Sequence, residues 1–294
     1  MKKSFFGWLI IFLLMAGINN AYSAELFVRN PGIEDIPQIS QPKGESARED
    51  IGLGKEYLKS YILDTKTIVS SPLHWENQDW IKASLILGMT IGLYTFDQDI
   101  HDWVQRNRNK TSDETAKVAK LFGDGRYMLP PLGLFYLYGC IAKSGKAEKT
   151  ALLSLESVVV SGFFTQIIKF AGHRHRPGHG DAYNKWSGPG FSTSNLSFPS
   201  GHTQTAFAIA TVVASEYEDK ALIAPLAYGI ATLTALSRIN DNAHWSSDVF
   251  LGAAIGYFTA KKIVSLHNKK RNMKISILPV INGRISGLVI SYNF

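Results

Sequence analysis

Apolar residues gather into long segments between Trp80 and Leu266, separated by stretches rich in polar residues, Gly and Pro. The segments are long enough for several helical turns, and few runs alternate apolar with polar residues as a half-buried strand does. The pattern therefore predicts six helices packed as a bundle. They are expected near residues 83–96, 127–142, 151–170, 203–217, 221–237 and 249–266.

The C-terminal stretch changes from helical to alternating periodicity. Residues 274–281 and 284–294 flank the dipeptide Asn282-Gly283, a strong hairpin signal. The second segment alternates like the last strand of a membrane β-barrel, but one hairpin cannot close a barrel. We therefore predict an all-α fold, a six-helix bundle with a short C-terminal β-hairpin that packs on the bundle or on an unidentified partner.

The N-terminus has the composition of an export signal. Lys2 and Lys3 precede an apolar run, and residues 21–24 offer small side chains for cleavage. We predict a signal peptide over residues 1–24 and a protein of the bacterial cell envelope, with an uncleaved signal anchor as the alternative. The remaining predicted parts are a polar arm (25–79), a helical domain (80–268) and a basic linker with the hairpin (269–294).

Hydropathy leaves open whether the bundle spans a membrane. A spanning helix needs about 20 largely apolar residues, whereas residues 83–96 and 249–260 are shorter and the third segment contains Glu156, Gln166 and Lys169. A second difficulty is orientation. If the signal peptide is removed and the first three predicted helices all cross the membrane, the end of the third helix lies on the cytoplasmic side. Membrane association is favoured, and a soluble periplasmic protein is the alternative.

Composition limits the partners. The net charge of +7 over 294 residues is spread without a basic block, so nucleic acid is a poor candidate and an anionic lipid or a phosphorylated substrate fits better. Cys140 is the only cysteine, which excludes an internal disulfide. It is predicted to be a buried thiol.

Three cations could surround one phosphate. Lys169, Arg176 and Arg238 supply fixed positive charge, which a phosphoryl group requires because charge accumulates on its equatorial oxygens during transfer. Ser200 and Gly201 precede an apolar run, so Ser200 is placed as a helix N-cap. The backbone N–H groups at a helix start favour an anion.

Two histidines could carry the chemistry. His244 and Asp248 are four residues apart, a spacing that places both on one face if the segment is helical. A carboxylate bonded to one ring nitrogen leaves the other free to attack phosphorus. His202 is then the candidate general acid for the leaving oxygen, because an imidazole titrates near neutral pH.

These residues resemble the type 2 phosphatidic acid phosphatase superfamily, which includes bacterial class A acid phosphatases and vanadium haloperoxidases. The likeness covers about residues 80–266 and rests on three signatures. They are Lys169, six residues and Arg176-Pro177; then Pro199-Ser200-Gly201-His202; and then Ser237-Arg238, five residues, His244, three residues and Asp248. With helical segments between them, the signatures are expected to meet at one end of the bundle.

The resemblance implies roles that agree with the residue chemistry. Residues matching Lys169, Arg176, Ser200, Gly201 and Arg238 hold phosphate in that family. The residue matching His202 donates a proton, the one matching His244 is the nucleophile, and the one matching Asp248 orients it. We predict a metal-independent phosphatase without a cofactor that acts on phosphomonoesters or pyrophosphates through a phosphohistidine, with membrane lipids as the favoured substrates.

Several alternatives stay open at this point. A soluble acid phosphatase for small phosphoesters, a vanadium-dependent haloperoxidase, and a lipid-binding protein without turnover would share the anion pocket. His173, His175 and His179 resemble a metal cluster, but the neighbouring arginines repel a cation. The histidines at 74, 101 and 267 follow no pattern and are predicted to be ordinary surface or packing residues. The loop 178–197 is either a lid over the site or a long surface connection.

Overall fold

The computed structural model describes residues 53–272, 275–282 and 285–292, and side chains up to residue 268. The predicted signal peptide and residues 25–52 of the predicted arm lie outside this part. The α-helices of the described part are α2 (Lys55–Ser70), α3 (Asn77–Thr95), α4 (Asp97–Arg106), α5 (Lys110–Ala119), α6 (Gly125–Ala142), α7 (Gly145–Gly172), α8 (Gly201–Glu216), α9 (Ile223–Asn240) and α10 (Ser246–Asn272). Short 3₁₀-helices cover Ser71–His74, Lys120–Gly123 and Pro177–His179.

The predicted fold class, an all-α six-helix bundle with a short C-terminal β-hairpin, is wrong because the described part contains nine α-helices. The six predicted segments overlap α3 and α6–α10. The helices that were missed are α2, α4 and α5, whose sequences carry no long apolar run. Polar helices with one narrow apolar stripe are hard to distinguish from loops in sequence, because only tertiary packing selects them.

Two strands follow the helices. Strand β1 (Ile275–Asn282) pairs antiparallel with β2 (Ile285–Tyr292), and Pro279 stands opposite Leu288 in the register. Strand β1 ends at Asn282. The two residues between the strands lie outside the described part.

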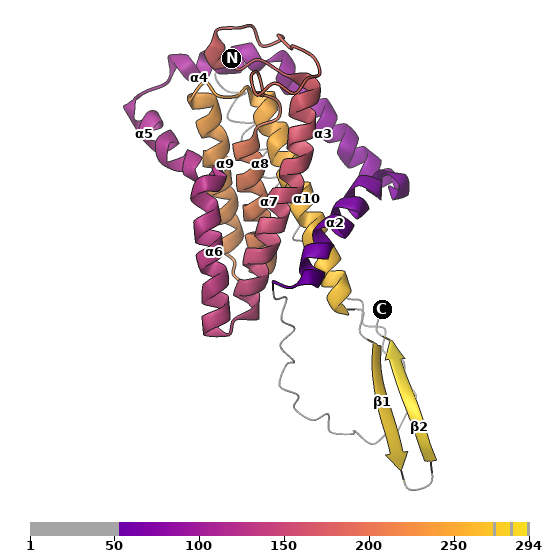
Figure 1. Ribbon diagram of the computed structural model, residues 1–294. Coiled ribbons are helices and arrows are strands. Elements are labelled where there is room, and N and C mark those ends of the chain that lie inside the picture. The colour runs from indigo at the N-terminus through magenta and orange to yellow at the C-terminus, as the bar shows by residue number, and fades with distance from the viewer. Residues whose placement is uncertain (1–52, 273–274, 283–284, 293–294) are drawn as a thin grey trace, which may run out of the picture. The chain divides into compact units, whose positions relative to one another are not determined.

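Helix α8 lies at the centre of the bundle, where it packs against α7, α9 and α10 (Figure 1). The apolar core lies where α7, α8 and α10 meet. Its fully or almost fully buried members are Leu153, Val160, Ala208, Val212, Ala260, Ile263 and Val264. Helices α4 and α5 lie across one end, and α5 packs against α9.

Two glycines allow α10 to approach α8. A Cβ at Gly252 would collide with the backbone carbonyl of Ser200, and a Cβ at Gly256 would collide with that of Gln204. The four-residue spacing of these glycines puts both on one face of α10. Close packing along this face holds the start of α8 against the start of α10.

Candidate functional site

The predicted site residues come from chain segments that meet at one end of the bundle. Helix α7 ends there, α8 and α10 begin there, and α9 reaches it through its last turn. The long loop between α7 and α8 lies at the same end in Figure 1. The topology thus brings all three signatures together.

Lys169 lies in the last turn of α7 and is 8% exposed. Its ammonium donates to the backbone carbonyls of Leu196 and Ser197, at 2.5 and 3.4 Å. A Cβ at Gly201 would lie 4.0 Å from Cε of Lys169. Lys169 therefore borders the start of α8, where the second signature begins.

Ser200 is the N-cap of α8, as the sequence predicts. Its hydroxyl oxygen accepts hydrogen bonds from the backbone N–H and the hydroxyl of Thr203, at 3.5 and 3.0 Å. Its own N–H donates to the backbone carbonyl of Asp248 at 2.9 Å. The first-turn N–H groups of α8, together with the positive end of the helix dipole, make an anion-binding position beside Gly201 and His202.

The two arginines differ in how they are held. Arg238 is 6% exposed, and its guanidinium donates to the carboxylate of Asp241 at 2.7 Å and to the hydroxyl of Ser237 at 3.1 Å. Arg176 is half-buried, and within the described part its guanidinium makes no hydrogen bond to protein. Its five donors are therefore available to a ligand.

His244 lies just before α10, so its spacing to Asp248 is not that of a helix face. The chain turns through Trp245, and Nδ1 of His244 lies 3.6 Å from Oδ2 of Asp248. That oxygen also accepts a hydrogen bond from the N–H of Trp245 at 2.9 Å, as in a capping box. His244 and Asp248 therefore lie close together as expected, but because the chain turns before α10 and not because both lie on one face of a helix.

Ser197 is a further polar neighbour that the sequence analysis missed. Its hydroxyl donates to Oδ2 of Asp248 at 2.5 Å and lies 3.4 Å from Nδ1 of His244. A serine in a loop rich in serine carries no distinguishing signal. Its contacts with Asp248 and His244 depend on how the loop packs against α10, which the sequence does not indicate.

Arg174 and Asp97 form a second missed feature. The Arg174 side chain is fully buried, donates to Oδ1 of Asp248 at 2.6 Å and to Oδ2 of Asp97 at 2.7 Å, and is surrounded by aromatic rings. Asp97 also accepts hydrogen bonds from the N–H of Ser247 at 2.9 Å and from the hydroxyl of Ser246 at 2.5 Å. Arg174, which is itself held by Asp97, thereby fixes the orientation of the Asp248 carboxylate.

Charge and burial set the protonation of the two histidines. Burial, with Lys169 and Arg176 nearby, holds the pKa of His244 well below its usual value, although Asp248 opposes the shift. A neutral His244 keeps a lone pair on the nitrogen that does not face Asp248. Burial and then Arg238 lower the pKa of His202 to about 4.

The negative charge of Asp124 partly offsets the effect of the nearby arginines on the pKa of His202. Asp124 is the N-cap of α6, and its Oδ2 lies 4.0 Å from Nε2 of His202. Its charge raises the pKa of His202 against the larger effects of burial and Arg238. The hydrogen bond from Arg126 lowers the pKa of Asp124 itself to about 2, so this carboxylate is ionised at neutral pH.

The loop 178–197 folds back over the end of α7. Trp186 pairs with Arg174 in an isolated bridge, and its indole N–H donates to the hydroxyl of Tyr94 at 3.2 Å. Phe191 is 91% exposed and its ring lies 6.0 Å from that of Phe170. The loop covers Arg174 rather than standing away from the bundle.

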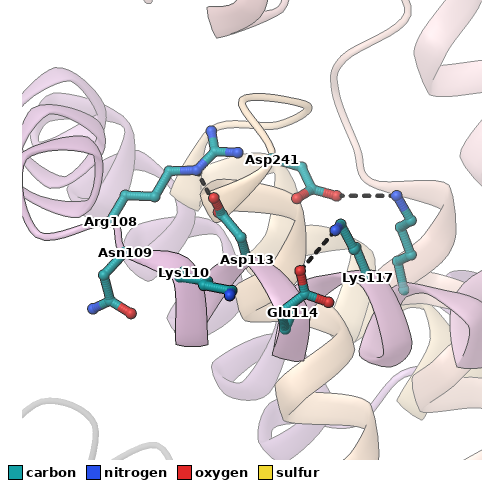
Figure 2. Close-up of a pocket in the computed structure, with 8 residues that line it drawn as sticks. Arg108, Asn109, Lys110, Asp113, Glu114, Lys117 and Asp241 are labelled. Carbon is teal, nitrogen blue, oxygen red and sulfur yellow. Dashed lines mark hydrogen bonds and ion pairs between the residues drawn. The ribbon is translucent and has the colours of Figure 1, made fainter.

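A polar cavity of about 520 Å³ lies beside Arg238, along α5 and the end of α9 (Figure 2). Asp241, the ion-pair partner of Arg238, forms part of its wall and lies 3.8 Å from Lys120. Arg108 is paired with Asp113, and Lys117 is paired with Glu114. Arg108, Lys117 and Lys120 are thus paired with carboxylates, and Lys110 is the lining cation for which the described part shows no ion pair. The cavity is therefore a charged border of the site and not a second cluster of free cations.

The histidines of the loop are engaged in hydrogen bonds. His173 contacts the carbonyls of Phe170 and Ser192, at 3.1 and 3.0 Å. Both ring nitrogens of His175 have partners, Asp181 at 2.6 Å and Ser187 at 2.8 Å. Although His175, His179 and Asp181 lie close enough together to share an ion, these contacts give the His175 ring a structural role.

His244 is influenced by the charges of Lys169 and Arg176, and His202 by those of Arg238 and Arg176, so these groups lie near one another at the end of the bundle where α8 starts. The cations can stabilise charge on three oxygens, one imidazole can attack, and the other can exchange a proton. This set is suited to the transfer of a phosphoryl group.

Comparison with known proteins finds similarity to the same family. Residues 150–272 match the family model described as the PAP2 superfamily. A lipid A 1-phosphatase of Porphyromonas gingivalis is 49% identical over 65 residues, which is 22% of this chain but only 15% of that protein. A lipid A 1-phosphatase of Rhizobium etli is 26% identical over 203 residues, covering 63% of this chain and 82% of that protein.

Two solved structures are similar. Aquifex aeolicus LpxE is 21% identical with a TM-score of 0.47, and the match covers 58% of this chain and 95% of that one. A transmembrane PAP2-type phosphatidylglycerolphosphate phosphatase from Bacillus subtilis is 17% identical with a TM-score of 0.46, covering 73% of this chain and 95% of that one.

Proposed function

We propose, from the membership of residues 150–272 in the PAP2 superfamily, that this protein is a phosphoric ester hydrolase that removes phosphate from a membrane lipid. The family match agrees with the resemblance predicted from the three signatures. The observation that carries the proposal is the convergence of Lys169, Arg176 and Arg238 around His244 and His202. The proposed substrate class follows from the two relatives, both of them lipid A 1-phosphatases, and lipid A carrying a 1-phosphate is the first candidate.

The proposed reaction has two steps. The nitrogen of His244 that faces away from Asp248 attacks phosphorus, an N–P bond forms, and the bond to the leaving oxygen breaks while protonated His202 gives that oxygen its proton. Water then attacks the phosphohistidine, neutral His202 takes the proton from the water, and the N–P bond breaks to release phosphate. The three cations hold the transferring oxygens throughout.

Substrate binding is expected to charge His202. In the free protein burial and then the charges of Arg238 and Arg176 lower the pKa of His202. A phosphate dianion among these arginines compensates their charge, which favours the imidazolium. The general acid therefore forms in the complex, where it is needed.

A membrane location is supported by the distribution of side chains. Helix α7 and residues 246–268 of α10 are long and apolar enough to span a membrane, although a buried helix of a soluble protein passes the same test. Large apolar side chains also point outward from α2, α6 and α9, among them Ile62, Ile141 and Leu226 at 73%, 83% and 60% exposed. Cys140, predicted to be buried, is exposed on α6. Lipid would cover these faces more favourably than water does.

The test is phosphate release by purified full-length protein in detergent. Lipid A with a 1-phosphate is compared with a soluble phosphomonoester, each with and without a chelator, and His244→Gln serves as the blank. Hydrolysis of the lipid, lost in His244→Gln, supports the proposal. Preference for the soluble ester would contradict the lipid assignment, and full activity of His244→Gln would contradict the nucleophile.

A further inference from the structure

A second group of buried polar side chains lies far from the site, between α2, α7 and α10. Asp64, Glu156 and His267 are 2%, 0% and 8% exposed. Glu156 precedes Lys169 by 13 residues on α7, which is about 20 Å along a helix. None of the three takes part in the proposed phosphoryl transfer.

The ring nitrogen Nε2 of His267 faces both carboxylates. It lies 3.0 Å from Oδ2 of Asp64 and 3.2 Å from Oε2 of Glu156. Both contacts are ion pairs when the imidazole is protonated, and within the described part Oε1 of Glu156 is buried without a hydrogen-bond partner. One N–H can donate fully to only one of the two facing oxygens, and it does not reach Oε1 of Glu156, so the imidazole alone does not satisfy the buried carboxylates.

The same geometry suits a bound cation. Ligands at about 2.0–2.2 Å from a tetrahedral zinc ion lie about 3.3–3.6 Å from one another. The two distances from Nε2 of His267, 3.0 and 3.2 Å, are a few tenths of an ångström shorter, and one ligand atom from each residue lies within 4.8 Å of the other two. We propose that Asp64, Glu156 and His267 bind a divalent transition-metal ion of the zinc class.

Neighbouring contacts give this site a supporting shell. The hydroxyl of Tyr57 donates to Oε2 of Glu156 at 2.9 Å, and its ring lies 5.8 Å from that of His267. A hydrogen bond of this kind orients a metal-binding carboxylate and limits its rotation. The supporting residue comes from α2, as Asp64 does.

The ion explains how α2 is attached. The buried residues of α2 are Tyr57, Ser60 and Asp64, which carry polar groups, whereas Leu58, Ile62 and Leu63 are exposed. Ile68 is the apolar residue of α2 that packs, partly buried, against the core. Apolar burial therefore supplies only part of this contact, and a metal bridge would join α2 to α7 and α10. The role assigned to the ion is structural, and the predicted hydrolysis does not depend on it directly.

The experiment measures metal in the full-length protein in detergent. After equilibration with Zn²⁺ and desalting, wild type should retain about one zinc per chain, and Zn²⁺ should raise its Tm after chelation. Glu156→Gln and His267→Gln should lose both effects. His74→Gln, at an exposed histidine outside the cluster, and His179→Gln, in the loop cluster, should retain both.

Two outcomes would overturn the proposal. One is wild-type protein that binds no zinc and has the same Tm with and without it. The other is zinc that is retained in Glu156→Gln but lost in His179→Gln, which would assign the ion to the loop. If the cluster variants do not fold, Co²⁺ added to His179→Gln decides, because the loop cluster has then lost a ligand. Visible absorption of a tetrahedral site with nitrogen and oxygen ligands, removed by Zn²⁺, would support the proposal, and no such absorption would overturn it. Phosphate release is scored separately.

Discussion

At the scale of single residues, the site depends on how Asp248 is held. Three donors from different segments reach its carboxylate: the buried guanidinium of Arg174, the hydroxyl of Ser197 and the backbone N–H of Trp245. The charged guanidinium is the strongest of them. The signatures predicted His244 and Asp248. They did not predict Arg174, although it lies inside the first signature, because the six residues between Lys169 and Arg176 are unspecified there.

We expect Arg174→Met to lower kcat about 10- to 100-fold with little change in KM, because Arg174 positions Asp248 without touching substrate. Removing the guanidinium also leaves two buried carboxylates unpaired, which should cost about 3–5 kcal/mol of stability. Asp97→Asn should lower kcat less. Steady-state kinetics and thermal unfolding check this, with the exposed Arg106→Met as control. An unchanged kcat in folded Arg174→Met would contradict the positioning role.

The pH dependence should separate free protein from complex. Because burial and Arg238 lower the pKa of His202 to about 4, kcat/KM, which reports the free protein, should fall as pH rises above that region. Bound phosphate raises the pKa of His202, so the basic limb of kcat should lie at higher pH. Profiles of both parameters from pH 3 to 9, an experimental range wide enough for either limb, check the shift. Coincident basic limbs, or the same limb in His202→Asn, would argue against His202 as the acid.

At the scale of elements, the contact between α8 and α10 sets the site. Ser200 begins α8, its carbonyl faces Gly252, and its N–H bonds to the carbonyl of Asp248. The apolar segments of these helices were visible in sequence. Helices α4 and α5 were not visible in the sequence. Asp97, at the start of α4, was missed as well, because its partner Arg174 is 77 residues away in the chain.

Gly252→Ala and Gly256→Ala should destabilise the protein by about 1–3 kcal/mol, because each new methyl group meets a backbone carbonyl of α8. Gly88 and Gly92 on α3 face open space. Alanine at either position should be neutral or stabilising by up to about 1 kcal/mol. Thermal unfolding of the four variants makes the comparison, and equal Tm values would exclude close α8–α10 packing as the reason for these glycines.

At the scale of the whole molecule, polar residues are buried and large apolar residues face outward on several helices. Hydropathy along the sequence could not decide the location, because it averages the two faces of each helix. The structure separates them: Ser154, Ser157 and Ser161 point into the bundle from α7, while Val159 and Phe163 are about half exposed, at 50% and 52%.

We therefore expect the protein to remain in the membrane pellet after a carbonate wash at high pH and to need detergent for extraction. Immunodetection in pellet and supernatant checks this. A periplasmic marker protein should be released by the same wash. Release of this protein together with the marker would support the soluble alternative.

The placement of Arg174 between Asp97 and Asp248 also has a consequence during synthesis. The ribosome makes Asp97 first, and Asp248 follows Arg174 by 74 residues, about 4–15 s later at ordinary elongation rates. During that interval the guanidinium has one of its two carboxylates, and the proposed nucleophile His244 has not been made. On the proposed mechanism a nascent chain is therefore catalytically silent, and hydrolysis can begin only once the last bundle helix has joined the others.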